Sequence, residues 1–132
     1  MNREITFVGE VHTPYKAIED CPFNIDESGP LCSLEVYPKY IKGLIGLHPG
    51  TNILILYWLN YARRVTDVGY PYIGAKNELR GTFARRTPHR PNPIGAATIR
   101  IIKIEKNTVY VRGLDCLDGT KLIDIKPAIL KE

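Results

Sequence analysis

The sequence lacks long apolar runs and any recognisable disulfide or metal-binding pattern. Its longest uninterrupted apolar stretch is the seven residues 53–59. A helix needs roughly 20 such residues to cross a bilayer, so we expect no membrane span. The three cysteines show no C-x-x-C spacing, which disfavours a disulfide framework or a zinc knuckle, and we expect reduced thiols. The three histidines lie far apart, so we expect no metal.

Nucleotide-binding and targeting signatures are also missing. The chain contains neither G-x-G-x-x-G nor a P-loop, which excludes the usual dinucleotide and nucleoside-triphosphate sites. Its first residues contain no apolar stretch like that of a signal peptide, so we predict a cytoplasmic protein. The 132 residues are 44% hydrophobic and 24% charged, as in ordinary globular proteins. We expect residues 1–132 to form one domain.

Short segments with strand-like patterning are spread along the chain. We predict strands at 4–12, 33–37, 53–59 and 79–85, and a hairpin of 97–105 with 109–114. The segment 53–59 should be central, and 38–47 should supply a helical turn. In the hairpin, Asn107 suits the left-handed conformation that a tight turn needs, and the adjacent Ile101 and Ile102 indicate a bulge. We therefore predict an all-β fold, a small single-domain β-barrel with long loops and few short helices.

Positive charge is concentrated in one segment. Between Lys76 and Lys106 there are eight basic and two acidic residues, a net charge of +6, whereas the rest of the chain carries −2. A localised positive field attracts phosphate groups and nucleic acids. A solvated basic face is the alternative interpretation.

Within this segment, residues 81–95 read GTFARRTPHRPNPIG. Three prolines in six residues fix φ near −65° and prevent regular secondary structure, so the residues between them are held on a stiff backbone. Arginine offers a planar fork of donors to phosphate or carboxylate. We interpret the segment as a ligand-binding loop; a proline-rich turn with incidental charge is the alternative.

A second segment, residues 113–127, reads GLDCLDGTKLIDIKP. Asp118-Gly119 is a turn signal that Asp115 could cap. Asp124 and Lys126 share one face of an extended stretch, where they could pair. Taken alone, this segment is explained as well by a structural turn as by a functional site.

Together, the two segments resemble the TrmO-like tRNA methyltransferase family. The first resembles the motif F-A-x-R-x-x-x-R-P-N-P-I-G, and the second resembles D-x-x-D-G-T-x-x-x-D-I-K-P. The resemblance extends over residues 5–127. It implies a small β-barrel that works as a homodimer, binds S-adenosylmethionine and methylates the threonylcarbamoyl-adenosine next to the tRNA anticodon.

The resemblance also implies roles for individual residues. The cofactor contacts that it implies are Asn24, Asn60, Tyr61, Arg86, Ala96, Asp115, Cys116, Leu117 and Asp118. The implied substrate-binding residues are Arg85, His89, Arg90, Asn92 and Lys126. A carboxylate suits the positive sulfonium and amino groups of the cofactor, and Arg86 suits its carboxylate. The urea-like acceptor nitrogen is weakly basic and calls for a base, for which Asp115 is the first candidate.

Three positions depart from the family pattern. Phe23-Asn24 stands where many relatives have Arg-Gln, Asn60 where many have His, and Ala128 where the usual ending is Lys-Pro-Tyr. These departures leave two alternatives open. One is a non-catalytic RNA-binding β-barrel whose tyrosines stack on bases. The other is a methyltransferase of the same fold that acts on a small metabolite or a protein.

Overall fold

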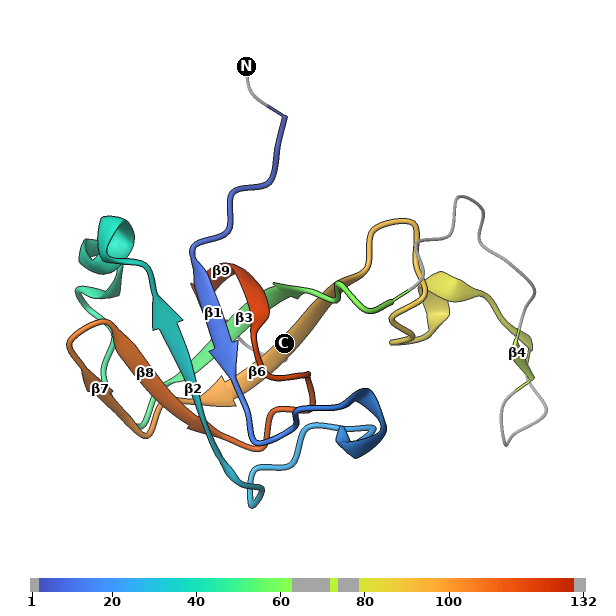
Figure 1. Ribbon diagram of the computed structural model, residues 1–132, viewed down its shortest axis with the longest axis horizontal. Coiled ribbons are helices and arrows are strands. Elements are labelled where there is room, and N and C mark those ends of the chain that lie inside the picture. The colour runs from blue at the N-terminus through green and yellow to red at the C-terminus, as the bar shows by residue number, and fades with distance from the viewer. Residues whose placement is uncertain (1–2, 63–71, 74–78, 130–132) are drawn as a thin grey trace.

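The structure, a computed structural model, describes residues 3–62, 72–73 and 79–129 (Figure 1). The strands are β1 Gly9–His12, β2 Leu31–Val36, β3 Asn52–Trp58, β4 Tyr72–Ile73, β5 Leu79–Arg80, β6 Ile94–Arg100, β7 Lys103–Glu105, β8 Thr108–Arg112 and β9 Thr120–Pro127. Three short 3-10 helices complete the elements: η1 Ile18–Asp20, η2 Pro38–Leu44 and η3 Thr82–Ala84. None of the helices in these ranges has the length and hydropathy to span a membrane.

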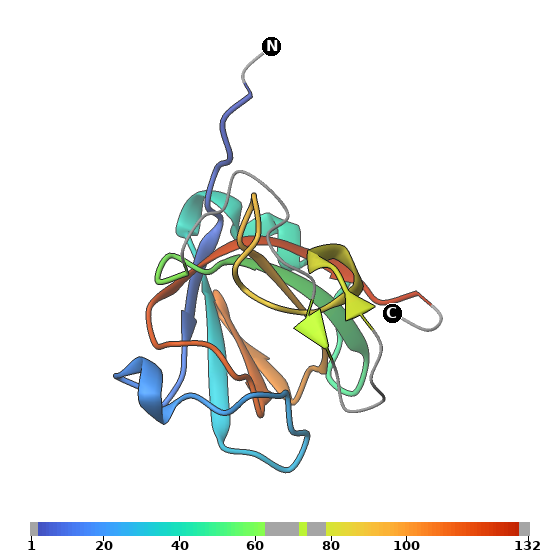
Figure 2. The same ribbon diagram turned by 90° about the vertical axis from the view of Figure 1, so that its right-hand side faces the viewer.

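Seven of the strands form one antiparallel sheet in the order β6-β3-β9-β1-β2-β8-β7, and β4 pairs with β5 separately. The sheet curls upon itself, as the end-on view of Figure 2 shows. The prediction of an all-β fold is therefore confirmed. Within the described residues, however, the ladder does not close into a hydrogen-bonded barrel, because β6 and β7 remain its edges.

The two edge strands are nevertheless joined at one corner of the sheet. Only Ile101 and Ile102 separate β6 from β7. The Ile101 N–H donates to the Thr51 carbonyl at 2.9 Å, and the Ile102 N–H donates to the Tyr110 carbonyl at 2.8 Å. Ile101 thus extends the ladder of β6 with β3, while Ile102 extends that of β7 with β8. The irregularity predicted at this pair is a corner between strands rather than a bulge within one.

The core lies inside the curl and is filled by alternate residues of the strands. On β3, Ile53, Ile55 and Tyr57 are buried, whereas the residues between them are half-buried on the outer face. This strand pairs with β6 on one side and β9 on the other, so the prediction of a central strand here is confirmed. Burying each such apolar side chain stabilises the fold by about 1.5–3 kcal/mol.

Three local predictions are wrong. The first strand begins only at Gly9, because alternation marks a strand but does not supply the partner that it needs. Only Leu79–Arg80 of the segment 79–85 is a strand, and Thr82–Ala84 forms a 3-10 turn. In the β7–β8 hairpin, the residue with positive φ (53°) is Lys106, whereas the Asn107 side chain donates to the Val36 carbonyl of β2 at 2.8 Å.

Candidate active site

The loop of residues 113–119 connects β8 to β9 and is fastened to the loop of residues 13–30. Gly113 adopts a φ of 76°, and a Cβ at this position would lie 1.4 Å from the Asp26 carbonyl oxygen. The Asp26 N–H donates to the Gly113 carbonyl at 2.9 Å. Only glycine fits such a close approach in this conformation. The two loops are therefore held backbone to backbone.

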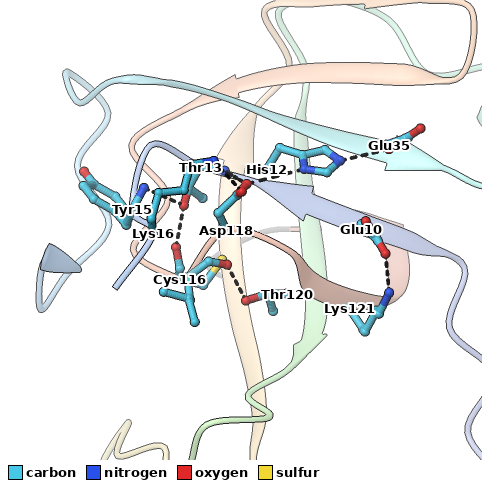
Figure 3. Close-up of polar contacts among 11 residues, drawn as sticks. Glu10, His12, Thr13, Tyr15, Lys16, Glu35, Cys116, Asp118, Thr120 and Lys121 are labelled. Atoms are coloured by element: carbon cyan, nitrogen blue, oxygen red, sulfur yellow. Dashed lines mark hydrogen bonds and ion pairs between the residues drawn. The ribbon is translucent and has the colours of Figure 1, made fainter. Parts of the chain in front are cut away.

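Asp118 fastens the same loop to the end of β1 (Figure 3). Its carboxylate accepts bonds from the Thr13 N–H at 3.0 Å and from Lys16 Nζ at 2.6 Å. The Thr13 hydroxyl donates to the Cys116 carbonyl at 2.9 Å. Burial opposes ionisation of Asp118, but the bonds from Lys16 and Thr13 outweigh it and lower its pKa. A cofactor contact by Asp118 would have to share a carboxylate that the protein already uses.

Asp115 has a different environment. It is half-buried, and its Oδ1 accepts a hydrogen bond from the Tyr57 hydroxyl at 3.3 Å. Burial raises the pKa of Asp115, although its own N–H, the Tyr57 hydroxyl and the positive charge of Arg86 oppose this. Burial and the nearby carboxylate raise the pKa of Tyr57, so its phenol keeps its proton and donates it. Asp115 is therefore a carboxyl group that binds a proton more readily than an ordinary aspartate.

Ionisable groups from separate parts of the chain lie near enough to Asp115 to be affected by its charge. The pKa values of Tyr15, Cys21 and Tyr61 are raised, mainly by burial and in part by the negative charge of Asp115. Cys116 is 1% exposed, and burial raises its pKa to about 12, so this thiol is not a nucleophile. All three cysteines are free thiols. The surroundings of Asp115 thus combine a guanidinium, phenol groups and shielded thiols.

Arg86 connects the proline-rich loop to the sheet. Its Nη2 donates to the Ala96 carbonyl on the edge strand β6 at 2.7 Å. The Leu59 N–H donates to the Pro93 carbonyl at 2.8 Å and holds the other end of the loop against the end of β3. Figure 1 shows the segment 79–92 lying to one side of the seven-stranded sheet, beyond the end of β3 and the start of β6.

Gly95 links the two sequence motifs through β3. It lies opposite Tyr57 in the β3–β6 ladder, and a Cβ on Gly95 would lie 2.4 Å from the ring of Tyr57. The glycine that ends the first motif therefore makes room for the tyrosine that binds Asp115 in the second motif. Tyr57 is not among the residues predicted for the site, because a tyrosine inside an apolar run gives the signal of a core residue.

The remaining predicted cofactor residues have fewer described contacts. Asn60 is exposed just beyond β3, and its N–H donates to the Trp58 carbonyl at 3.0 Å. Asn24 is exposed on the loop that Asp26 fastens, and within the described residues its side chain makes no hydrogen bond to Asp115. Leu117 is half-buried, and its carbonyl accepts a bond from the Thr120 hydroxyl at 2.6 Å.

The predicted substrate residues divide into two groups. Arg90 Nη1 donates to the carbonyls of Arg85, at 2.7 Å, and Thr87, at 3.2 Å, so part of this guanidinium stiffens its own loop. His89 and Asn92 are exposed on the same loop. Lys126, by contrast, lies on β9, opposite Leu54 of β3. The predicted pairing of Lys126 with Asp124 is confirmed, with 2.9 Å between Nζ and Oδ2.

One cluster of side chains has a geometry that could hold a metal ion, although no metal site was expected from the sequence. Glu10, His12 and Glu35 bring ligand atoms within 4.8 Å of one another on the outer face of β1 and β2. His12 Nε2 lies 2.9 Å from Glu35 Oε1, and Glu10 pairs with Lys121 (Figure 3). The register of β1 with β2 places Glu10 opposite Glu35, which sequence spacing alone does not indicate.

Comparisons with known proteins bear on these residues. Residues 10–131 match the family model of the tRNA-methyltransferase O N-terminal domain. The chain is 42% identical over 121 residues to the probable S-adenosyl-L-methionine-binding protein VirR of Rhizobium radiobacter, covering 92% of this chain and 68% of that protein. It is 37% identical over 120 residues to a probable S-adenosyl-L-methionine-binding protein of Archaeoglobus fulgidus, covering 91% of this chain but 32% of that protein.

A solved structure of TrmO superposes on the chain with a TM-score of 0.77 and 25% sequence identity. The match covers 98% of this chain and 58% of the TrmO chain. The chain thus spans a little over half of that structure.

Proposed function

The chain belongs to the family of the tRNA-methyltransferase O N-terminal domain, and from this membership we propose that it is an S-adenosylmethionine-dependent tRNA methyltransferase with its site around Asp115. The acceptor that we propose is the threonylcarbamoyl-adenosine next to the anticodon. The main support is the link from Gly95 through Tyr57 to Asp115, because it joins the two motifs at one carboxyl group. The names of the relatives from Rhizobium radiobacter and Archaeoglobus fulgidus support the cofactor.

The residues around Asp115 fit S-adenosylmethionine. Bound there, this cofactor would supply the methyl group together with a positive sulfonium and an amino acid end. Asp115 offers a partly desolvated carboxylate to the positive groups, and Arg86 offers a guanidinium to the carboxylate. Tyr61 is 37% exposed and close enough to Asp115 for that carboxylate to help raise its pKa, so its aromatic ring is available to the cofactor. Asp118, already bound to Thr13 and Lys16, would then hold the loop in place.

The other predicted contacts complete the proposed cofactor site. We assign them to the rim of the site and to its backbone: Asn24, Asn60, Ala96, Cys116 and Leu117. Of these, Cys116 is buried, so it would contribute through its backbone rather than its thiol.

Asp115 is also the proposed base. A carboxyl group with a raised pKa is better matched than an ordinary aspartate to removing a proton from the acceptor nitrogen near neutral pH. The Tyr57 hydroxyl fixes one of its oxygens. Methyl transfer also requires the acceptor nitrogen to be held in line, about 3–3.5 Å from the methyl carbon. The stiff proline-rich loop supports such positioning.

Substrate binding is assigned to the basic loop and its neighbours. We propose that Arg85, His89 and Asn92 face the anticodon stem together with Lys126, and that Arg90 also keeps the loop rigid. The local net charge of +6 supports an RNA partner. Arg90 would contribute through loop geometry as well as charge, since part of its guanidinium is already bonded to the loop.

We further propose that the enzyme is a cytoplasmic homodimer. Leu79 and Phe83, on the basic segment, are 70% and 75% exposed. Large apolar side chains exposed to this extent on one segment support a surface that a second copy of the chain covers. Light scattering coupled to size exclusion should give twice the mass of one chain. Phe83→Ser should shift the equilibrium toward the monomer, and an unchanged mass would contradict a role for this surface.

One labelling experiment tests the function. The protein is incubated with S-adenosylmethionine carrying a labelled methyl group and with total RNA, and the RNA is digested to nucleosides. We expect the label in a methylated threonylcarbamoyl-adenosine. Label in protein or in small molecules alone would favour a different acceptor. Calorimetry showing RNA binding without cofactor binding would favour the non-catalytic RNA-binding module.

A further inference from the structure

A cavity lies at the corner of the sheet, where β6 and β8 end. Its volume is about 400 Å³, within the range of roughly 300–1,000 Å³ that holds small organic ligands. Ile99 and Ile101 line it and are 4% and 1% exposed. Ile25 and Ile102 add further apolar surface. The cavity is therefore apolar over much of its wall.

The cavity follows from the way the sheet is joined. Ile101 and Ile102 bring β6 beside β8 through their bonds to Thr51 and Tyr110. On the β6 side of this corner, β6 pairs only with β3 in the described part of the chain, so β6 and β8 are not bonded to each other there. The neighbouring loop of residues 25–29 is held by the backbone hydrogen bond from the Asp26 N–H to the Gly113 carbonyl, which keeps this wall in place. The open end of a curled sheet is a common position for ligand sites.

Two arginines give the cavity its charge. Arg100 comes from the end of β6 and Arg112 from the end of β8, and both line the cavity. Arg112 Nη1 makes one long contact, 3.4 Å from the Gly29 carbonyl. The Arg100 guanidinium has no hydrogen bond or ion pair within the described ranges, although its backbone pairs with Asn52 of β3. Glu27 also lines the cavity and limits its net charge to one positive unit.

We propose that this cavity binds a small organic monoanion with an apolar body. A carboxylate would lie between Arg100 and Arg112, where guanidinium groups can bind it in bidentate fashion. The apolar body would lie against the isoleucines. Glu27 disfavours polyanions, so the occupant is a small acid rather than an RNA backbone.

The cavity shares no lining residue with the site proposed around Asp115, and the inference does not depend on the function proposed for that site. Arg100 lies four residues beyond Ala96 on β6. At about 3.3 Å per residue, this places it roughly 13 Å from the residue that Arg86 contacts.

The test uses hexanoate as the probe, added to the isotopically labelled protein and followed by the amide resonances in NMR spectra. We expect saturable shifts at Ile101, Ile102 and Arg112, with Tyr61 and Asp115 unmoved. Acetate has the charge without the apolar body, and 1-hexanol has the apolar body without the charge; each should bind at least about tenfold more weakly. Inorganic phosphate tests whether charge alone suffices. Equal binding of 1-hexanol, or of phosphate, would overturn the proposal.

Variants locate the binding. Arg100→Gln and Arg112→Gln should each weaken hexanoate binding about tenfold, since each removes a charge-assisted bond. Ile102→Trp should abolish it by filling the cavity without changing the charge. Lys42→Gln, on the exposed helix η2, is the matched control and should bind as the parent does. Thermal melting confirms that each variant is folded. Unchanged affinity in folded Arg100→Gln and Arg112→Gln, or shifts centred on Asp115, would contradict the proposal.

Discussion

Asp115 and Asp118 show how the position of a residue in the fold decides its chemistry. They lie three residues apart in one loop, yet burial raises the pKa of Asp115, whereas Lys16 and Thr13 lower that of Asp118. A group with a raised pKa is a better proton acceptor near neutrality, and one with a lowered pKa is a better permanent anion. Within one loop, Asp115 is therefore suited to chemistry and Asp118 to holding the structure.

Arg86→Ala tests the assignment of this guanidinium to the cofactor. We expect the affinity for S-adenosylmethionine to fall at least about tenfold, because a charge-assisted hydrogen bond is lost. Isothermal calorimetry measures it, with Lys42→Ala as a control that removes an exposed positive charge from η2. Unchanged affinity would remove Arg86 from the site.

Tyr57→Phe tests the environment of Asp115. The Tyr57 hydroxyl lowers the pKa of Asp115, so its removal should raise that pKa further. If Asp115 is the base, the acidic limb of the kcat profile moves to higher pH. If Asp115 acts only as a counter-charge, the pH dependence of cofactor affinity moves instead. A profile unchanged in both measurements would show that this hydrogen bond has no part in catalysis.

Gly95→Ala tests the space beneath Tyr57. The added methyl group would lie 2.4 Å from the ring, so the ring must move away from Asp115 or the strands must separate. We expect a loss of about 1–3 kcal/mol of unfolding free energy together with reduced activity. Urea denaturation measures the stability. Gly43→Ala is the control, because a Cβ there meets nothing within 4 Å.

At the scale of elements, His12 ties β1 to β2 and to the Asp118 loop. A hydrogen bond to Glu35 raises its pKa, burial opposes this, and Asp118 adds to it. The protonated form is thus favoured in the folded state. This stabilisation is complete below the ordinary histidine pKa of about 6.5 and is lost as pH rises through the higher folded value. Glu10 and Asp118, whose pKa values are lowered, contribute in the opposite sense and lose their contribution in acid.

His12→Gln should therefore destabilise the protein more at pH 5.5 than at pH 9. The effect should be below about 1 kcal/mol, because the ion pairs are partly exposed to water. Urea unfolding at both pH values measures it. An equal loss of stability at both pH values would show that packing, rather than charge, is what His12 contributes.

The elements that could be predicted from the sequence are those set by local patterning. The buried strand β3 and the turn of η2 follow from residues near one another in the chain. Residues 4–8 of the predicted strand 4–12 are not in a strand, because a strand also needs a partner strand with which to form hydrogen bonds. The order of strands depends on contacts between distant segments, which periodicity in one segment does not encode. Contacts between distant segments also explain why Lys106, rather than Asn107, takes the left-handed turn position. The Asn107 side chain instead donates a hydrogen bond to the Val36 carbonyl on β2.

The whole molecule combines a positive segment with a mildly acidic remainder. If that segment binds RNA, affinity should fall steeply with salt, since each phosphate contact releases counterions. With three or four phosphate contacts, we expect the affinity for RNA to fall roughly 50- to 150-fold between 50 and 200 mM salt. Filter binding with tRNA measures it. Lys126→Ala should weaken tRNA binding with little effect on cofactor affinity, and a parallel loss of both affinities would mean that the two subsites are not separate.

The candidate site was predictable only in part. Arg86 and Asp115 belong to the segments that the sequence singles out, and the structure places Arg86 near enough for its charge to lower the pKa of Asp115. Tyr57 and Gly95 could not be assigned, because their importance arises from being opposite each other in a ladder. Arg100 and Arg112 could not be predicted as a pair, because they lie within two separate predicted strands and neither gives a signal of the other.

The corner at Ile101 and Ile102 has a consequence for how the chain tolerates change. Side chains alternate between the two faces of a strand, so the number of residues at this corner decides which side chains of the next strand point into the core. Deletion of one of these two isoleucines would exchange the faces of β7. Lys103 and Glu105 would then point inward in place of Ile104, which packs against the core. Evolution can vary the identity of these two residues more readily than their number.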